Sequence, residues 1–130
     1  MSSTKDTSTF ELKSSLQLSD FVEILLEPLN KYQHLYLIRL GLHEALVNAV
    51  KHGNKFDSSK IIKVKRIITP HWWVWIIMDQ GQGMVHDKRK FSLPKRTDSV
   101  SGRGLFIINE CFDDVRWSPK GNKLQLALKR

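Results

Sequence analysis

Hydrophobic positions along this chain recur with two different periods, which predict strands and helices in turn. Residues 1–8 are polar and rich in Ser and Thr, so we expect a flexible amino terminus there. Apolar residues then alternate, with Ser14 interrupting them, and predict an opening strand: Phe10, Leu12, Leu16 and Leu18. The chain shows no internal repeat or linker, so residues 9–130 are predicted to form one domain.

Two helices are predicted next. Ser19 or Asp20 can cap a first helix, whose apolar residues recur at intervals of three and four and which Pro28 limits at its end. A longer helix is expected from about residue 34 to 51, ending before Gly53-Asn54. It places one set of apolar residues toward the core: Leu35, Ile38, Leu42, Ala45, Leu46, Ala49 and Val50.

The second half of the chain predicts a sheet. Residues 61–69 alternate partly between apolar and basic side chains, and residues 72–78 are rich in strand-forming types, as in an antiparallel hairpin. Residues 80–101 contain few large apolar side chains and predict a long loop, of the kind that often forms a lid. A helix at residues 103–111 is expected before two final strands at 113–117 and 123–129.

Composition favours an ordinary hydrophobic core. A chain of 130 residues needs no disulfide or metal to hold it together, and its single cysteine, Cys111, lies in an apolar segment that favours a packed thiol over a nucleophile. Alternation puts Trp73 and Trp75 on one face of their strand and Trp72 on the other, where core packing is favoured over a binding platform. No segment resembles a signal peptide or a membrane span, so we expect a cytoplasmic location.

The chain is basic, with 21 Lys and Arg against 13 Asp and Glu and a formal charge of +8. This charge favours anionic partners such as nucleotide, nucleic acid or an acidic protein surface. Much of the excess lies in Lys88-Arg89-Lys90, Lys95-Arg96 and Lys129-Arg130 rather than along one recognition helix, so direct DNA binding is not expected. A solvated basic loop explains the same residues equally well.

An acid and an amide on the long helix carry the first candidate chemistry. Glu44 and Asn48 are four residues apart and share one helix face, which His52 extends. A carboxylate at this position can take a proton from an attacking hydroxyl, and an amide oxygen can ligate magnesium. Taken alone, the pair also fits a solvated polar helix face.

Two glycine turns follow. Asp79 ends an apolar run and can accept a hydrogen bond from an exocyclic amine such as that of adenine, while Gly81 and Gly83 let the backbone approach a ring. Gly102 and Gly104 leave backbone N–H groups free at the start of a helix, which attracts phosphate. Each turn alone also fits ordinary turn chemistry, but the order of the three motifs predicts a nucleotide pocket.

Several common nucleotide and metal signatures are absent from the sequence. The chain contains no phosphate-loop motif, no dinucleotide glycine fingerprint and no protein-kinase catalytic loop. Its five histidines have no cysteine partners at zinc spacing, so a structural metal is not expected.

The three motifs together resemble the Bergerat-fold (GHKL) ATPases, from about Phe10 to the carboxyl terminus. Residues 44–54 look like the N box of the small anti-sigma factor serine/threonine-protein kinases, and residues 101–108 followed by 113–115 are similar to their second glycine box. The resemblance implies an α/β (α+β) two-layer sandwich, with helices packed on one face of a mixed, mostly antiparallel sheet. ATP would lie between the long helix and a mobile lid.

The resemblance also implies residue roles. Glu44 would be the general base, Asn48 a Mg²⁺ ligand, and Asp79 the partner of the adenine amine. The implied ATP site comprises Asn48, His52, Asp79, Gly81, Gly83, Met84, Gly102, Arg103, Gly104 and Leu105.

In that family, the kinase binds and inhibits a sigma factor and phosphorylates a Ser or Thr of an anti-sigma factor antagonist, so that phosphorylation sets which partner is held. A homodimer through the first strand or a sheet edge is also compatible with the resemblance. This chain departs from the family in its basic lid and in residues 121–124, which lack a threonine that many members carry. A non-catalytic nucleotide-binding switch module and a basic nucleic-acid-binding domain remain as alternatives.

Overall fold

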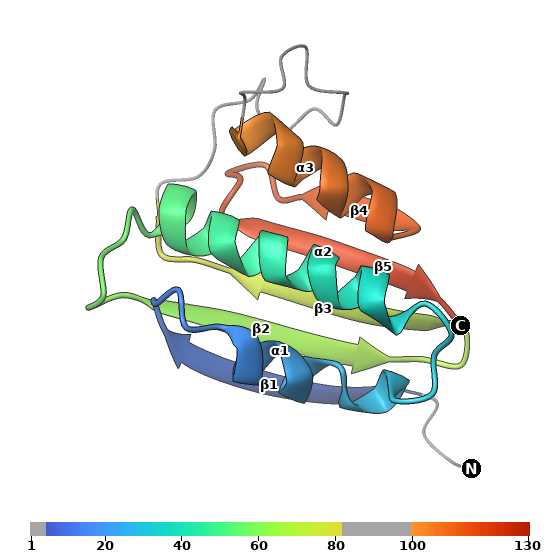
Figure 1. Cartoon of the computed structure of the whole chain (residues 1–130). Coiled ribbons are helices and arrows are strands. Elements are labelled where there is room, and N and C mark those ends of the chain that lie inside the picture. Colours follow the sequence, from blue (N-terminus) through green and yellow to red (C-terminus); the bar gives the residue numbers. More distant parts are fainter. Residues whose placement is uncertain (1–4, 82–99) are drawn as a thin grey trace.

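The computed structural model describes residues 5–81 and 100–130, which form two layers (Figure 1). One layer is a five-stranded sheet in the order β1-β2-β3-β5-β4, and the helices cover one of its faces. The strands are β1 (Asp6–Lys13), β2 (Ile61–Ile68), β3 (Trp72–Met78), β4 (Asp114–Trp117) and β5 (Lys123–Lys129). The helices are α1 (Ser19–Leu25), the 3₁₀ turn η1 (Glu27–Leu29), α2 (Leu35–Asn48), the π-helical turn η2 (Ala49–Gly53) and α3 (Val100–Cys111).

The predicted two-layer fold is confirmed, with two differences in detail. All four strand pairings are antiparallel, so this sheet is not mixed. The first strand begins at Asp6 and ends at Lys13, which leaves Leu16 and Leu18 outside it. The chain leaves the sheet at buried Ser14, whose N–H donates to the Lys60 carbonyl oxygen (2.9 Å), and Leu18 is buried at the entry to α1.

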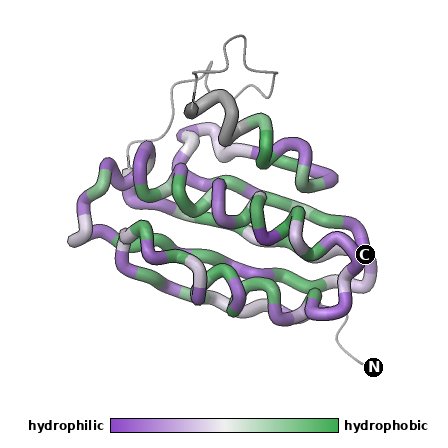
Figure 2. The backbone as a smooth tube through the Cα atoms, viewed as in Figure 1, coloured by the Kyte–Doolittle hydropathy of each residue, from purple (hydrophilic) through white to green (hydrophobic). Residues whose placement is uncertain are grey.

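The side chains of the sheet alternate between a core face and a far face. On the core face, a row of paired residues crosses all five strands beneath the helices: Phe10, Val64, Ile77, Leu124 and Trp117. Hydrophobic and hydrophilic residues alternate along α1, α2 and the coloured part of α3 (Figure 2), and the buried residues of these helices, such as Phe21, Leu46 and Ile108, belong to one core. Among the described residues, no helix is long and apolar enough to cross a membrane.

Trp75 fastens α1 to the sheet. Its side chain is fully buried, and its indole N–H donates to the Leu25 carbonyl oxygen at the end of α1 (3.0 Å). Arg66, opposite Trp75 on β2, donates to the neighbouring Ile24 carbonyl oxygen (2.9 Å). Carbonyl groups in the last turn of a helix lack the regular partners of the helix interior, and here the sheet supplies donors to two of them. The predicted faces are confirmed, since Trp72 lies on the far face under the Lys129 ammonium group.

A glycine brings α2 and α3 close together. A Cβ atom at Gly41 would lie 2.7 Å from Cε2 of Phe112 and 2.8 Å from Cβ of Cys111, so a side chain there would push the helices apart. Cys111 is partly buried against the core, as predicted, and burial raises the pKa of its thiol. The two helices run in opposite directions, which brings the start of α3 toward the end of α2 (Figure 1).

Replacing Trp75 by Phe should lower the free energy of unfolding by about 2 kcal/mol, because it empties part of the core and removes a donor from Leu25. Urea denaturation followed by circular dichroism measures this change. Trp72→Phe is the matched control on the same strand, and it should change stability by less than about 1 kcal/mol because Trp72 is partly exposed. Equal losses in the two variants would contradict the assignment of Trp75 as the anchor of α1.

Candidate functional site

The first two predicted motifs meet where α2 ends and β3 ends. The polar residues Asn48, His52 and Asp79 line one small cavity between the helix layer and the sheet. The other residues that line it are Ala45, Ala49, Gly53, Ile77, Trp117 and Leu124. The cavity measures about 10 Å³, which is room for about one water molecule, so a nucleotide base would enter only if it widened.

Two glycines make close contact possible around Asp79. Gly53 ends η2, and a Cβ atom on it would overlap the Asp79 carboxyl group. Gly81 lies against the Gly53 carbonyl group, which a Cβ atom on Gly81 would also overlap. The Gly81 N–H donates to Oδ1 of Asp79 (2.8 Å), which closes the turn after β3. The backbone of the helix end and the backbone of the turn therefore touch across the carboxyl group, and larger side chains at either glycine would separate them.

Asn54 holds these segments in register, a role that no sequence pattern predicted. It is fully buried, and its Nδ2 amide donates to the Ile61 carbonyl oxygen (3.0 Å) at the start of β2. Its Oδ1 accepts from the N–H of Gln80 (2.8 Å), between Asp79 and Gly81. One side chain thus links the end of the helix to two strands. The one sequence feature that pointed to Asn54 was its position directly after Gly53, at the end of the first motif.

Burial raises the pKa of the Asp79 carboxyl group above its ordinary value of 3.8. The hydrogen bond from Gly81 and the charges of Lys60 and Lys120 act in the opposite direction, but the burial effect is the largest. A carboxyl group that is partly removed from water is a strong hydrogen-bond acceptor with few competing partners. This arrangement suits recognition of a neutral amino group.

Asn48 has an unused hydrogen-bonding atom inside the site. Its Nδ2 is buried and has no hydrogen-bond partner within residues 5–81 and 100–130. Unpaired buried amides are uncommon in proteins, and those that occur often face a missing water, ion or ligand. Since the two ends of an amide are assigned from their surroundings, the same position can present the oxygen to a cation. Mg²⁺ binds through one or two protein oxygens together with phosphates and water, so this donor set fits the ion.

Glu44 lies one helical turn before Asn48, as the sequence predicts, but it does not line the cavity. It is half-buried on the side of α2 toward α3, where its negative charge contributes to the raised pKa of Cys111. The structure therefore brings Asn48, His52, Asp79 and Gly81 together and places the predicted general base at the edge of this group.

The second glycine box lies inside α3 rather than before it. The helix starts at Val100, so Gly102 belongs to its first turn, where backbone N–H groups have no partner within the helix. The two antiparallel helices touch where Gly41 meets Cys111. Gly104 lies seven residues before Cys111, and Asn48 lies seven residues after Gly41. Gly104 and Asn48 should therefore lie at a similar level along the two helices. Gly83 and Met84, and the side chains of Arg103 and Leu105, lie outside the described residues.

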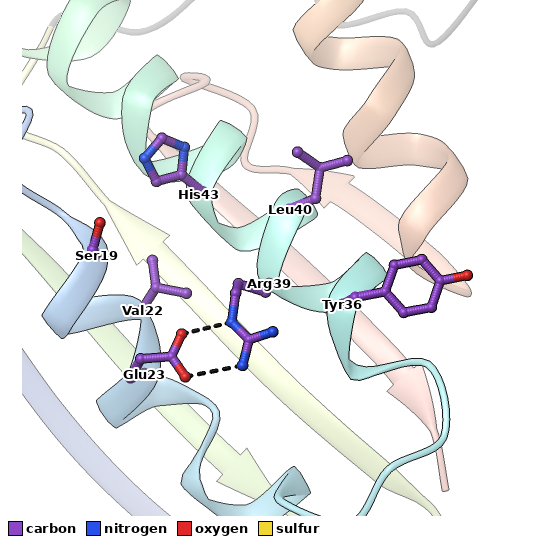
Figure 3. Close-up of a pocket in the computed structure, with 7 residues that line it drawn as sticks. All are labelled: Ser19, Val22, Glu23, Tyr36, Arg39, Leu40 and His43. Carbon is purple, nitrogen blue, oxygen red and sulfur yellow. Dashed lines mark hydrogen bonds and ion pairs between the residues drawn. The ribbon is translucent and has the colours of Figure 1, made fainter.

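A larger hollow lies elsewhere, between α1 and α2 (Figure 3). It measures about 330 Å³ and is crossed by a bidentate ion pair between Arg39 and Glu23, with Nε to Oε2 at 2.7 Å. The Arg39 guanidinium lowers the pKa of Glu23. None of the predicted site residues lines this hollow, so its size does not make it the nucleotide pocket.

Comparison with known proteins agrees with the geometry of the small cavity. The profile of a family described as the histidine kinase-like ATPase domain matches residues 23–128. The chain belongs to this ATPase domain family. It is also similar to the serine-protein kinase RsbW of Bacillus licheniformis, with 29% identity over 92 residues. That match covers 65% of this chain and 58% of the relative's length.

The raised pKa of Asp79 predicts a stability change with a definite sign. Because its pKa is higher in the folded chain, ionisation of Asp79 destabilises the fold as pH rises above 3.8. Asp79→Asn should therefore increase the free energy of unfolding at pH 7 and have little effect near pH 3. Urea denaturation between pH 3 and pH 7 measures the difference.

Asp57→Asn is a control that should change the free energy of unfolding in the opposite direction. Hydrogen bonds from Ser59 lower the pKa of Asp57, so its ionised form stabilises the fold above pH 3.8, and this stabilisation is lost as the pH falls below that value. Asp57→Asn should therefore weaken the fold at pH 7. If both variants shifted stability in the same direction, the burial of Asp79 would not explain its effect.

Asn54→Ala should cost about 2 kcal/mol in stability, because it leaves the Ile61 carbonyl and the Gln80 N–H without their partner. Asn30→Ala, at an exposed asparagine after η1, should change stability by less than about 0.5 kcal/mol. Thermal or urea unfolding compares the two variants. A loss at Asn54 no greater than at Asn30 would show that the buried amide does not hold the site together.

Proposed function

We propose that this chain is an ATP-dependent, Mg²⁺-dependent protein serine/threonine kinase. The observation that carries the proposal is that a partly buried Asp79 and Asn48, whose buried Nδ2 has no hydrogen-bond partner among the described residues, line one cavity. Membership of the histidine kinase-like ATPase domain family supports ATP as the nucleotide, and similarity to a serine-protein kinase supports serine or threonine as the acceptor. ATP would supply the phosphoryl group, with Mg²⁺ balancing its charge.

Each residue then has a distinct task. Asp79 would accept a hydrogen bond from the adenine amine, and Gly81 would leave room for the ring beside it. Asn48 would present its amide oxygen to the metal, and His52 would close the cavity on the same helix face. The N–H groups at the start of α3, around Gly102 and Gly104, would face the phosphates.

Glu44 would accept the proton from the attacking hydroxyl group. Its place at the edge of the cavity, one turn from Asn48, suits a group that meets a protein substrate arriving from outside. The remaining predicted residues, Gly83, Met84, Arg103 and Leu105, complete the proposed nucleotide site.

We further propose that the protein substrate is an anti-sigma factor antagonist and that the same chain holds and inhibits a sigma factor when the antagonist is absent or phosphorylated. The similarity to RsbW supports this assignment. In this proposal, residues 9–130 act in the cytoplasm as a single ATPase domain, without direct binding to DNA, and two copies can form a homodimer.

A second function is a nucleotide-dependent switch that transfers no phosphate. The absence of Glu44 from the residues that line the cavity favours this alternative. Both functions require nucleotide binding at Asp79, and they differ only in whether Glu44 acts on a substrate.

Two variants separate these functions. Asp79→Asn should weaken Mg·ATP binding, measured by isothermal titration calorimetry, by about 1–3 kcal/mol, because a buried hydrogen bond to the base is lost. Glu44→Gln should bind Mg·ATP as wild type does and should lose phosphate transfer to an added antagonist protein, measured by mass spectrometry.

Glu27→Gln, at an exposed glutamate in η1, is the control and should change neither measurement. Equal phosphate transfer by wild type and Glu44→Gln would contradict the role of Glu44. ATP binding without any transfer would support the switch, whereas absence of ATP binding by folded wild type would overturn both functions.

A further inference from the structure

The far face of the sheet is not covered by any described helix, because α1, α2 and α3 all lie on the opposite side (Figure 1). Strand pairing fixes which side chains this face presents. Its central strand, β3, contributes every second residue: Trp72, Val74, Ile76 and Met78. All four are partly exposed, and none belongs to the packed core. We call these four residues the β3 stripe.

Neighbouring strands widen the stripe at its middle. Ile67 on β2 and Ala127 on β5 both pair with Val74, so three apolar side chains lie side by side there. Ala127 is buried, whereas Ile67 and Val74 are partly exposed. A continuous group of partly exposed apolar side chains on one sheet face is a feature of interaction sites.

Lysines flank the stripe on both sides. Lys63 on β2 and Lys123 on β5 both pair with Met78, while Lys65 pairs with Ile76 and Lys129 with Trp72. No ion pair involves any of these four lysines within residues 5–81 and 100–130. Within the described strands, two carboxylates lie on this face: Glu11, opposite Lys63, and Asp114, which already binds Arg116 at 2.8 Å. The face therefore has an apolar centre and a basic border.

The dimensions of this face match one helix. Seven residues of β3 extend over roughly 20 Å, which equals the length of a helix of about 13 residues. The lysine rows on β2 and β5 each lie about 4.8 Å from β3 and so about 10 Å apart, close to the diameter of a helix with its side chains. A helix along β3 would place its apolar side on the stripe and its flanks over the lysines.

We infer that this face binds an acidic amphipathic helix of a partner protein, with leucine-like residues on the β3 stripe and Asp or Glu on both flanks. A second copy of this chain would bring its own lysine rows against these lysines, which like-charge repulsion opposes. Nucleic acid would meet aliphatic side chains at the centre of the face, where stacking needs aromatic ones. This surface is separate from the cavity at Asp79, so the inference does not depend on ATP binding.

The probe is a capped 18-residue peptide with leucines along one helix face and glutamates on both flanks, and fluorescence anisotropy follows its binding to the full chain. Lys63→Glu combined with Lys123→Glu should weaken binding at least tenfold. Ile76→Thr, which keeps a strand-forming residue, should weaken it about fivefold. The matched control, Lys31→Glu with Lys55→Glu, changes net charge equally but lies off this face and should leave affinity within twofold.

A peptide with lysines in place of the glutamates should not bind. The inference is overturned if the acidic peptide fails to bind the folded wild type, or if the control pair weakens binding as much as the lysines of the face do. It is also overturned if light scattering shows a dimer that Ile76→Thr dissociates, since the face would then belong to a second copy. Displacement of the peptide by a single-stranded oligonucleotide or by anionic lipid vesicles would assign the face to those ligands instead.

Discussion

The buried side chain of Asn54 is the constraint on which the candidate site depends. It joins the end of the long helix to the beginning of β2 and to the turn after β3. Its amide nitrogen donates one hydrogen bond, and its amide oxygen accepts the other. Only with these three segments in register can Gly53 and Gly81 approach each other across the Asp79 carboxyl group. The π-helical turn η2 ends at Gly53, directly before Asn54 and at the contact with Gly81.

The sheet divides the molecule into two surfaces with different chemistry. On the core face, apolar rows hold the helices, and the small polar cavity lies at the edge where strands and helix end. On the far face, β3 carries apolar side chains, and the lysines beside it on β2 and β5 form no ion pair within the described part of the chain. The proposed partner-binding face and the proposed nucleotide site therefore lie on opposite sides of the sheet.

Elements that depend on neighbouring residues in the sequence could be predicted, whereas contacts between segments far apart in the sequence could not. The hairpin of β2 and β3, the two final strands and the residues of α2 follow from local periodicity, and the structure confirms them. The hydrogen bond between Asn54 and Gln80 and the helix contact at Gly41 join segments distant along the chain, so no local pattern revealed them. Leu16 and Leu18 misled the strand prediction because a buried Ser14 ends the pairing before them.

The most direct test of the central claim is a titration of ¹⁵N-labelled wild-type protein with Mg·ATP, followed by two-dimensional NMR. If Asp79, Gly81 and Asn48 form the nucleotide site, the largest shifts should fall on the Gly53 and Gly81 backbone amides and on the Asn48 side-chain amide. The backbone amide signals of Lys63 and Lys65, on the far face, should not shift. Shifts confined to that lysine-rich face, or no shifts at all, would contradict the account.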